Sequence, residues 1–153
     1  MDGNLQHGYD VSPNASLTSN LHHSSMKIDL IEVYLFDPHW AANHLQGVGQ
    51  SSGCGLMMIY GENKKGAAEF ISPHSIHKFD LVKWASVWMK LKRYPTPAAL
   101  AHIESMIEIW GADRANIAKA ALMDLESKLS SSDQETNLDR KVLFEHTQSY
   151  FSF

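Results

Sequence analysis

Hydrophobic residues follow two kinds of pattern along the chain, first in short runs and then at helical spacing. Residues 27–36 carry apolar side chains at both odd and even positions, which predicts a strand covered on both faces. Residues 54–60 predict a second strand, and residues 67–71 predict a third. The connection between these two is short, so we expect an antiparallel hairpin and, with the first strand, a three-stranded meander.

The segments between these strands have the composition of turns and loops. Residues 37–53 contain three glycines and predict a long loop, which in a compact domain is usually functional or disordered. In the hairpin, Asn63 and Gly66 suit a positive φ. We expect the third strand to end at Ser72 and Pro73, since proline removes a backbone donor.

The second half of the chain predicts three helices, over residues 80–92, 96–110 and 113–129. Asp80 suits an N-cap, and Thr96 with a following proline suits a helix start. The apolar residues expected to face inward are Leu81, Trp84, Ala85, Trp88, Leu91, Leu100, Ile103, Met106, Ile107, Trp110, Ile117, Ala120, Ala121, Leu125 and Leu129. The sequence therefore predicts an α+β fold, with a three-stranded antiparallel meander packed on a helical layer.

Composition adds the boundaries of this domain. Residues 1–25 are rich in Asn, Ser and His with isolated apolar residues, so we expect a mobile N-terminal arm. Residues 26–129 form the predicted α+β domain. Residues 130–153 are expected to be a linker and a C-terminal tail, although residues 138–153 are too apolar for a plain solvated tail.

Charge and cysteine content exclude several classes of protein. The formal net charge is −4 over 153 residues, which argues against a nucleic-acid partner. No apolar run approaches the roughly 18 residues of a membrane span, so we expect no membrane partner. Cys54 is the single cysteine and cannot form an internal disulfide; we expect a half-buried or buried spectator. With no visible signal segment, the predicted location is cytoplasmic.

Several pieces occur in an order that resembles a known domain. They are the strand MKIDLIEVYLF, a glycine-containing loop, the hairpin GLMMIYGENKKGAAEF and the helix AKAALMDLESKL. Over about residues 26–129 they resemble the N-terminal capping domain of the mandelate racemase and muconate lactonizing branch of the enolase superfamily. The matching positions are Gly66 and Glu69 in the hairpin, and Ala121, Leu122, Asp124, Leu125 and Lys128 in the helix. Ala67, Ala68 and Ser127 depart from the glycine pattern of the family.

The resemblance implies a role at a site carried by another domain. In the family, this domain covers the mouth of a β/α barrel, and the barrel binds Mg²⁺ and forms an enolate next to a carboxylate. The capping loops select the substrate, and here they would lie at about residues 37–53 and 69–78. The substrate-loop candidates are His39, Trp40, His44, Glu69 and His74. The end of the C-terminal tail, TQSYFSF, resembles a remnant of the first strand of that barrel. The residues after Leu129 are far fewer than the roughly 200 of a barrel, so we expect no catalytic residue and no bound cofactor in this chain alone.

Two further patterns have structural interpretations. Lys90 and Lys92 have the spacing of a catalytic lysine pair, but they end a predicted helix, where the helix dipole favours cations. His74 and His77 follow a proline and lack a further fixed ligand, so we expect no metal there.

Three functional hypotheses remain open. The first is a truncated capping domain, inactive alone, whose full-length relatives close over a Mg²⁺-dependent carboxylate isomerase, racemase or dehydratase. The second is one part of a split enzyme, completed by a separate barrel-containing chain. The third is a stand-alone protein-interaction module, which partners or self-associates through the apolar surface that a barrel would cover.

Overall fold

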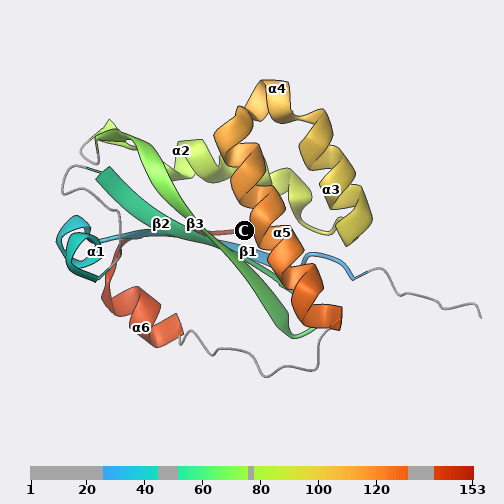
Figure 1. The fold of residues 1–153 in the computed structure, drawn as a ribbon, viewed down its shortest axis with the longest axis horizontal. Helices are drawn as coiled ribbons and strands as arrows, with labels where there is room; N and C mark the ends of the chain where they lie inside the picture. The colour runs from blue at the N-terminus through green and yellow to red at the C-terminus, as the bar shows by residue number, and fades with distance from the viewer. Residues whose placement is uncertain (1–25, 45–51, 76–77, 131–139) are drawn as a thin grey trace, which may run out of the picture.

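In the part of the chain that the structure describes, the sheet has four strands. The computed structural model describes residues 26–44, 52–75, 78–130 and 140–153. The strands are β1 (Leu30–Phe36), β2 (Ser52–Gly61), β3 (Lys64–Ser75) and β4 (Thr147–Ser152), and they form one antiparallel sheet in the order β3-β2-β1-β4 (Figure 1). The predicted α+β fold is therefore confirmed, with one strand more than the predicted meander.

The additional strand comes from the predicted tail. Residues 140–153 form a helix and then β4, which pairs with β1 from Glu32↔Ser152 to Phe36↔Thr147. This end of the chain therefore completes the same sheet instead of beginning a barrel. The predicted arm over residues 1–25 and nearly all of the predicted linker over residues 130–137 lie outside the described residues.

Helices lie on both faces of the sheet. They are α1 (Pro38–His44), α2 (Leu81–Ala85), the 3₁₀ helix η2 (Ser86–Leu91), α3 (Thr96–Ser105), α4 (Ile107–Trp110), α5 (Ala112–Ser130) and α6 (Arg140–Glu145). One face packs on α2 to α5 through a large core that includes Ile31, Val33 and Trp88. The other face packs on α1 and α6 through a smaller core (Figure 1). None of the described helices is long and apolar enough to cross a bilayer.

The longest helix, α5, approaches β3 very closely at Gly66. A Cβ atom at this position would lie 2.2 Å from the Ala121 carbonyl oxygen and 2.4 Å from the Leu125 backbone nitrogen. The prediction that Gly66 supplies a positive φ is wrong; Glu62 and Asn63 do so, with φ of 48° and 63°. Glycine is needed here because a helix backbone occupies the space of its side chain.

Two polar side chains of α5 also bind the backbone of β3. The Ala67 N–H donates to the Asp124 carboxylate at 2.9 Å. Lys128 Nζ donates to the Lys65 carbonyl at 3.1 Å and to Asp124 at 2.9 Å. These bonds fix the helix along the strand, and the apolar packing around Gly66 holds it against the sheet.

Several predicted boundaries need correction. The loop predicted over residues 37–53 contains α1, and residues 45–51 lie outside the described part of the chain. β3 continues through Pro73 to Ser75, because an outer strand of a sheet tolerates a proline. The loop predicted at residues 69–78 is therefore strand over most of its length.

The helical predictions hold in outline. Asp80 is the N-cap of α2 and accepts a bond from the Lys83 N–H at 3.0 Å, as predicted. The predicted helix over residues 80–92 changes to a 3₁₀ helix at Ser86. The predicted helix over residues 96–110 is interrupted at Met106, and the N-cap of α3 is Pro95 rather than Thr96.

Most of the predicted inward positions are buried. The residues that instead are exposed are Ile107, Ala120 and Leu129. The interruption at Met106 changes the helical phase and turns Ile107 outward. The buried positions of α5 are Ala115, Ala118, Ala121, Leu122 and Leu125, so Ala121 and Leu125 are the two that the pattern predicted. Ile117 is half-buried.

Trp88 is central to the larger core. Its side chain is completely buried, and its indole N–H donates to the Arg114 carbonyl at 3.1 Å. We expect Trp88→Ala to lower the free energy of unfolding by about 3–5 kcal/mol, because it leaves a large cavity. Met89, the next residue, is 50% exposed, so Met89→Ala should change stability by less than about 0.5 kcal/mol. Urea unfolding of both variants measures the difference, and equal losses would contradict the core role of Trp88.

Candidate functional site

The second face of the sheet contains a buried carboxylate. Glu32 lies in the middle of β1 on the same face as Tyr34 and Phe36, and its side chain is completely buried. A buried charge requires hydrogen bonds or an opposite charge, since the loss of hydration is costly. The surrounding strands and α6 supply both.

Four side chains bind the Glu32 carboxylate. One oxygen, Oε2, accepts bonds from the Tyr34 hydroxyl at 2.8 Å and the Tyr60 hydroxyl at 2.5 Å. The other, Oε1, accepts from the Tyr150 hydroxyl at 2.8 Å and from Arg140 Nη2. The five residues form what we call the Glu32 cluster, and they come from β1, β2, α6 and β4.

Burial and hydrogen bonding keep Tyr34 and Tyr60 protonated. Burial raises the pKa of both Tyr34 and Tyr60, and their hydrogen bonds to Glu32 raise it further. Both hydroxyls therefore remain donors at neutral pH. The cluster resembles a structural anchor more than a catalytic centre, because each carboxylate oxygen already accepts two bonds.

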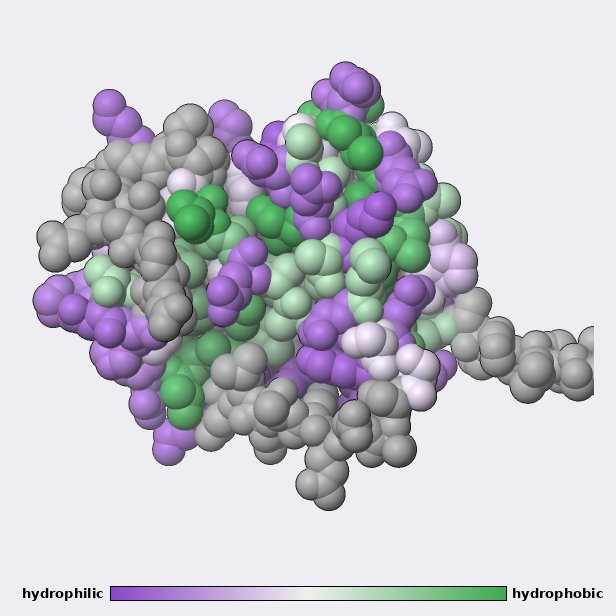
Figure 2. Space-filling view, viewed as in Figure 1, coloured by the Kyte–Doolittle hydropathy of each residue, from purple (hydrophilic) through white to green (hydrophobic). Residues whose placement is uncertain are grey.

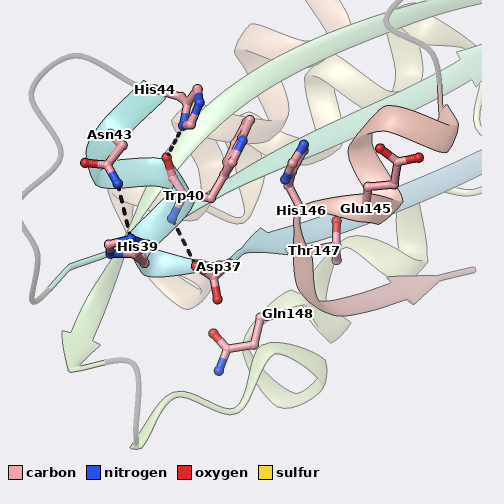
Figure 3. Close-up of a pocket in the computed structure, with 9 residues that line it drawn as sticks. All are labelled: Asp37, His39, Trp40, Asn43, His44, Glu145, His146, Thr147 and Gln148. Atoms are coloured by element: carbon pink, nitrogen blue, oxygen red, sulfur yellow. Dashed lines mark hydrogen bonds between the residues drawn. The ribbon is translucent and has the colours of Figure 1, made fainter.

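A pocket opens where α1 approaches the junction of α6 and β4 (Figure 3). Its volume is about 500 Å³, and it is lined by Asp37, His39, Trp40, Asn43, His44, Glu145, His146, Thr147 and Gln148. Asp37 begins α1 by accepting a bond from the Trp40 N–H at 3.0 Å. One side of the pocket comes from residues 37–44 and the other from residues 145–148, about a hundred residues later in the sequence.

Three flat rings form a stack on one wall of this pocket. The Trp40 indole lies 4.5 Å from the His146 ring and 5.1 Å from the His44 ring, with interplanar angles of 10° and 14° (Figure 3). His44 Nδ1 also lies 2.8 Å from the Trp40 carbonyl oxygen. The stack joins α1 to the C-terminal segment and fixes the orientation of the imidazoles.

The structure brings together three of the five predicted substrate-loop residues. His39, Trp40 and His44 line the pocket. Glu69 is exposed on β3 and does not line it, and His74 lies in β3 with its side chain outside the described residues. Glu69 therefore lies on a strand instead of in the loop expected at residues 69–78, and the role of the five residues at a substrate site stays a prediction.

Sequence reasoning missed the C-terminal contribution to the pocket. Glu145, His146 and Gln148 lie in a segment interpreted as a tail, and they reach α1 only because β4 pairs with β1. It also missed the Glu32 cluster. The available signal was a glutamate in the middle of a strand predicted to be covered on both faces, which requires a buried partner.

Other candidate chemistry is limited among the residues that the structure describes. Within residues 26–44, 52–75, 78–130 and 140–153, no group of three His, Cys, Asp or Glu side chains is placed to hold a metal ion. These residues therefore do not fit a Mg²⁺ site like that of the family barrel. Lys90 and Lys92 are both exposed at the end of η2. Cys54 is buried, as predicted, and burial together with the charge of Glu69 raises the pKa of its thiol, which disfavours the reactive thiolate.

Comparison with known proteins does not assign the site. No family model, curated protein or solved structure matches the chain.

Arg140 is the cationic partner of Glu32 in the described structure, and its side chain is half exposed. We expect Arg140→Met to lower the free energy of unfolding by about 2–3 kcal/mol, because the buried Glu32 carboxylate loses its ion pair. Water that enters where the guanidinium was solvates the carboxylate and reduces this loss. Lys90→Met, at an exposed position on η2, should cost less than about 0.5 kcal/mol. Urea unfolding compares them; a similarly small loss in Arg140→Met would show that the tyrosines alone satisfy Glu32.

Proposed function

We propose that this chain is a capping-type domain of the kind found in the mandelate racemase and muconate lactonizing branch of the enolase superfamily. It would contribute substrate-facing residues to a site whose chemistry is carried by a barrel, and it would not catalyse a reaction alone. The barrel would come from outside these 153 residues, as in a split enzyme. In the family, Mg²⁺ belongs to that barrel and supplies charge stabilisation for an enolate.

One observation carries this proposal. The residues that support the resemblance in sequence contact one another in the fold: Gly66 of the hairpin packs against Ala121 and Leu125 of α5. Asp124 and Lys128 of the same motif bind the β3 backbone on either side of Gly66. The hairpin motif and the helix motif thus form a single contact between β3 and α5, as expected if both belong to one type of domain.

The placement of α1 is a second support. β1 ends, β2 begins and β3 ends at the same end of the sheet, as the pairs Leu35↔Gly55 and Cys54↔Ile71 require. The connections after β1 and β3, where capping loops were expected, therefore leave the sheet on one side. At this end, His39 and His44 would present imidazole groups to a substrate carboxylate, and Trp40 would hold their helix in place.

The first test concerns the chain alone. Incubated in D₂O with Mg²⁺ and a panel of 2-hydroxy and 2-amino carboxylates, it should incorporate no deuterium at the α-carbon above a no-protein control. The physical reason is that the described residues contain no metal site, so no general base lies beside a bound metal ion. Proton NMR measures the α-proton signal, and Mg²⁺-dependent loss of that signal would contradict the proposal.

The same measurement tests the positive half of the proposal. A neighbouring reading frame that encodes Lys-x-Lys and spaced Asp, Glu and Glu residues would be co-expressed with this chain, and the pair should exchange the α-proton where neither does alone. His44→Ala should reduce the exchange and Lys90→Gln should not, since only His44 lines the pocket. Exchange that is unchanged when this chain is omitted would exclude a capping role.

A protein-interaction module is the second candidate function. Figure 2 shows hydrophobic residues gathered over α4 at one end of the molecule. There Ile107 and Ile109 are 41% and 71% exposed. Adjacent exposed apolar side chains favour association with a protein surface.

Ile109→Ser tests this alternative. If α4 mediates self-association, the variant should dissociate at concentrations where the unmodified chain is a dimer or larger, while its stability stays within about 0.5 kcal/mol. Met89→Ser is the matched control, because Met89 is also exposed but lies on η2. Sedimentation at several concentrations measures the mass. A monomeric unmodified chain, or an equal effect of Met89→Ser, would count against an α4 interface.

A further inference from the structure

A second cavity lies on the helical side of the molecule, where α2 begins beside the first turn of α5. Its volume is about 460 Å³, and it is lined by Lys78, Phe79, Asp80, Lys83, Trp84 and Arg114. The proposed capping role makes no use of these residues. Their chemistry differs from that of the α1 pocket, since cations and large aromatic rings dominate it.

The cavity concentrates positive charge in an acidic protein. Lys78, Lys83 and Arg114 line it, although the whole chain has a formal net charge of −4. The single carboxylate, Asp80, uses Oδ1 to cap α2 through the Lys83 N–H. The salt bridges of the described residues involve other side chains, so these three cations are not neutralised by an ion pair there.

Arg114 is held in a fixed orientation. Its Nε donates to the Trp110 carbonyl at 2.6 Å, and Nη1 donates to the Trp84 carbonyl at 3.2 Å. A guanidinium carries five N–H donors, so the fork retains donors beyond these two bonds. A cation that the fold has already ordered loses little entropy when it binds an anion.

Aromatic rings form the apolar wall of the cavity. Trp84 is partly buried and contacts Phe79 at 5.3 Å, Trp88 at 5.0 Å and Phe70 at 4.9 Å between ring centroids. These contacts fix the indole in one position. A ligand in this cavity would therefore meet a rigid apolar surface as well as the charged groups.

We propose that this cavity binds a small organic anion, with a phosphate or carboxylate held by Lys78, Lys83 and Arg114 and an aromatic or other apolar body against Trp84 and Phe79. Charge-assisted hydrogen bonds would supply specificity for the anionic head. The apolar wall would distinguish such a ligand from a free inorganic ion. The site is independent of the capping role and of the α1 pocket.

The test titrates the full chain with phenyl phosphate, benzoate, inorganic phosphate and the neutral benzyl alcohol. Binding is followed by the indole N–H signal of Trp84 in ¹H–¹⁵N spectra, which Trp84→Phe identifies. We expect saturable shifts with phenyl phosphate or benzoate, and weaker binding of inorganic phosphate and benzyl alcohol. The ratio of phenyl phosphate to benzoate affinity shows which anionic head the site prefers.

Exposed lysines supply variants that keep the fold. Lys78→Gln and Lys83→Gln should each weaken phenyl phosphate binding roughly tenfold, the effect of one charge-assisted hydrogen bond. Lys90→Gln should leave it unchanged, because Lys90 is exposed on η2 and does not line the cavity. The proposal is overturned if no organic anion saturates the signal, if benzyl alcohol binds as well as phenyl phosphate, or if Lys90→Gln weakens binding equally.

Discussion

The Glu32 carboxylate constrains the fold more than any other single group. A buried charge has to be matched by donors, and β1 and β2 provide only the hydroxyls of Tyr34 and Tyr60. The remaining donors, Arg140 and Tyr150, arrive with α6 and β4. The C-terminal segment is therefore an integral part of the domain, and the α1 pocket depends on it because His146 lies between Arg140 and Tyr150 in the sequence.

The opposite face of the sheet is organised by size instead of charge. Gly66 and the small residues of α5 let a helix backbone approach a strand closely, and Trp88 is completely buried in the same core. Close packing of this kind tolerates few changes of volume. The face that carries Glu32 thus requires a hydrogen-bond partner for each buried polar group, and the opposite face requires side chains whose shapes fit closely. β1 and β2 contribute to both faces and have to meet both requirements.

Local patterns predicted the first three strands, the α2 cap and the three helical regions, because each of these depends on neighbours within a few residues. They did not predict β4, whose six residues gain their stability from pairing with β1 more than a hundred positions earlier. The family resemblance pointed to the segment that carries His39, Trp40 and His44, but nothing in the sequence joined His146 to it. The sequence indicated that Gly66 has to be glycine, but for the wrong reason. The requirement comes from the backbone of α5, which occupies the space of a side chain and which only the tertiary structure places there.

The hydrogen bonds from Asp124 and Lys128 to β3 also affect how readily two molecules associate through the edge of the sheet. The outer edge of a sheet offers unpaired backbone groups to any extended chain, and β3, with 12 residues, is a long outer strand. α5 occupies the Ala67 N–H and the Lys65 carbonyl, and its charged side chains replace a second strand there. The motif that fixes a helix in place thus also blocks fibre-like strand addition at this half of β3.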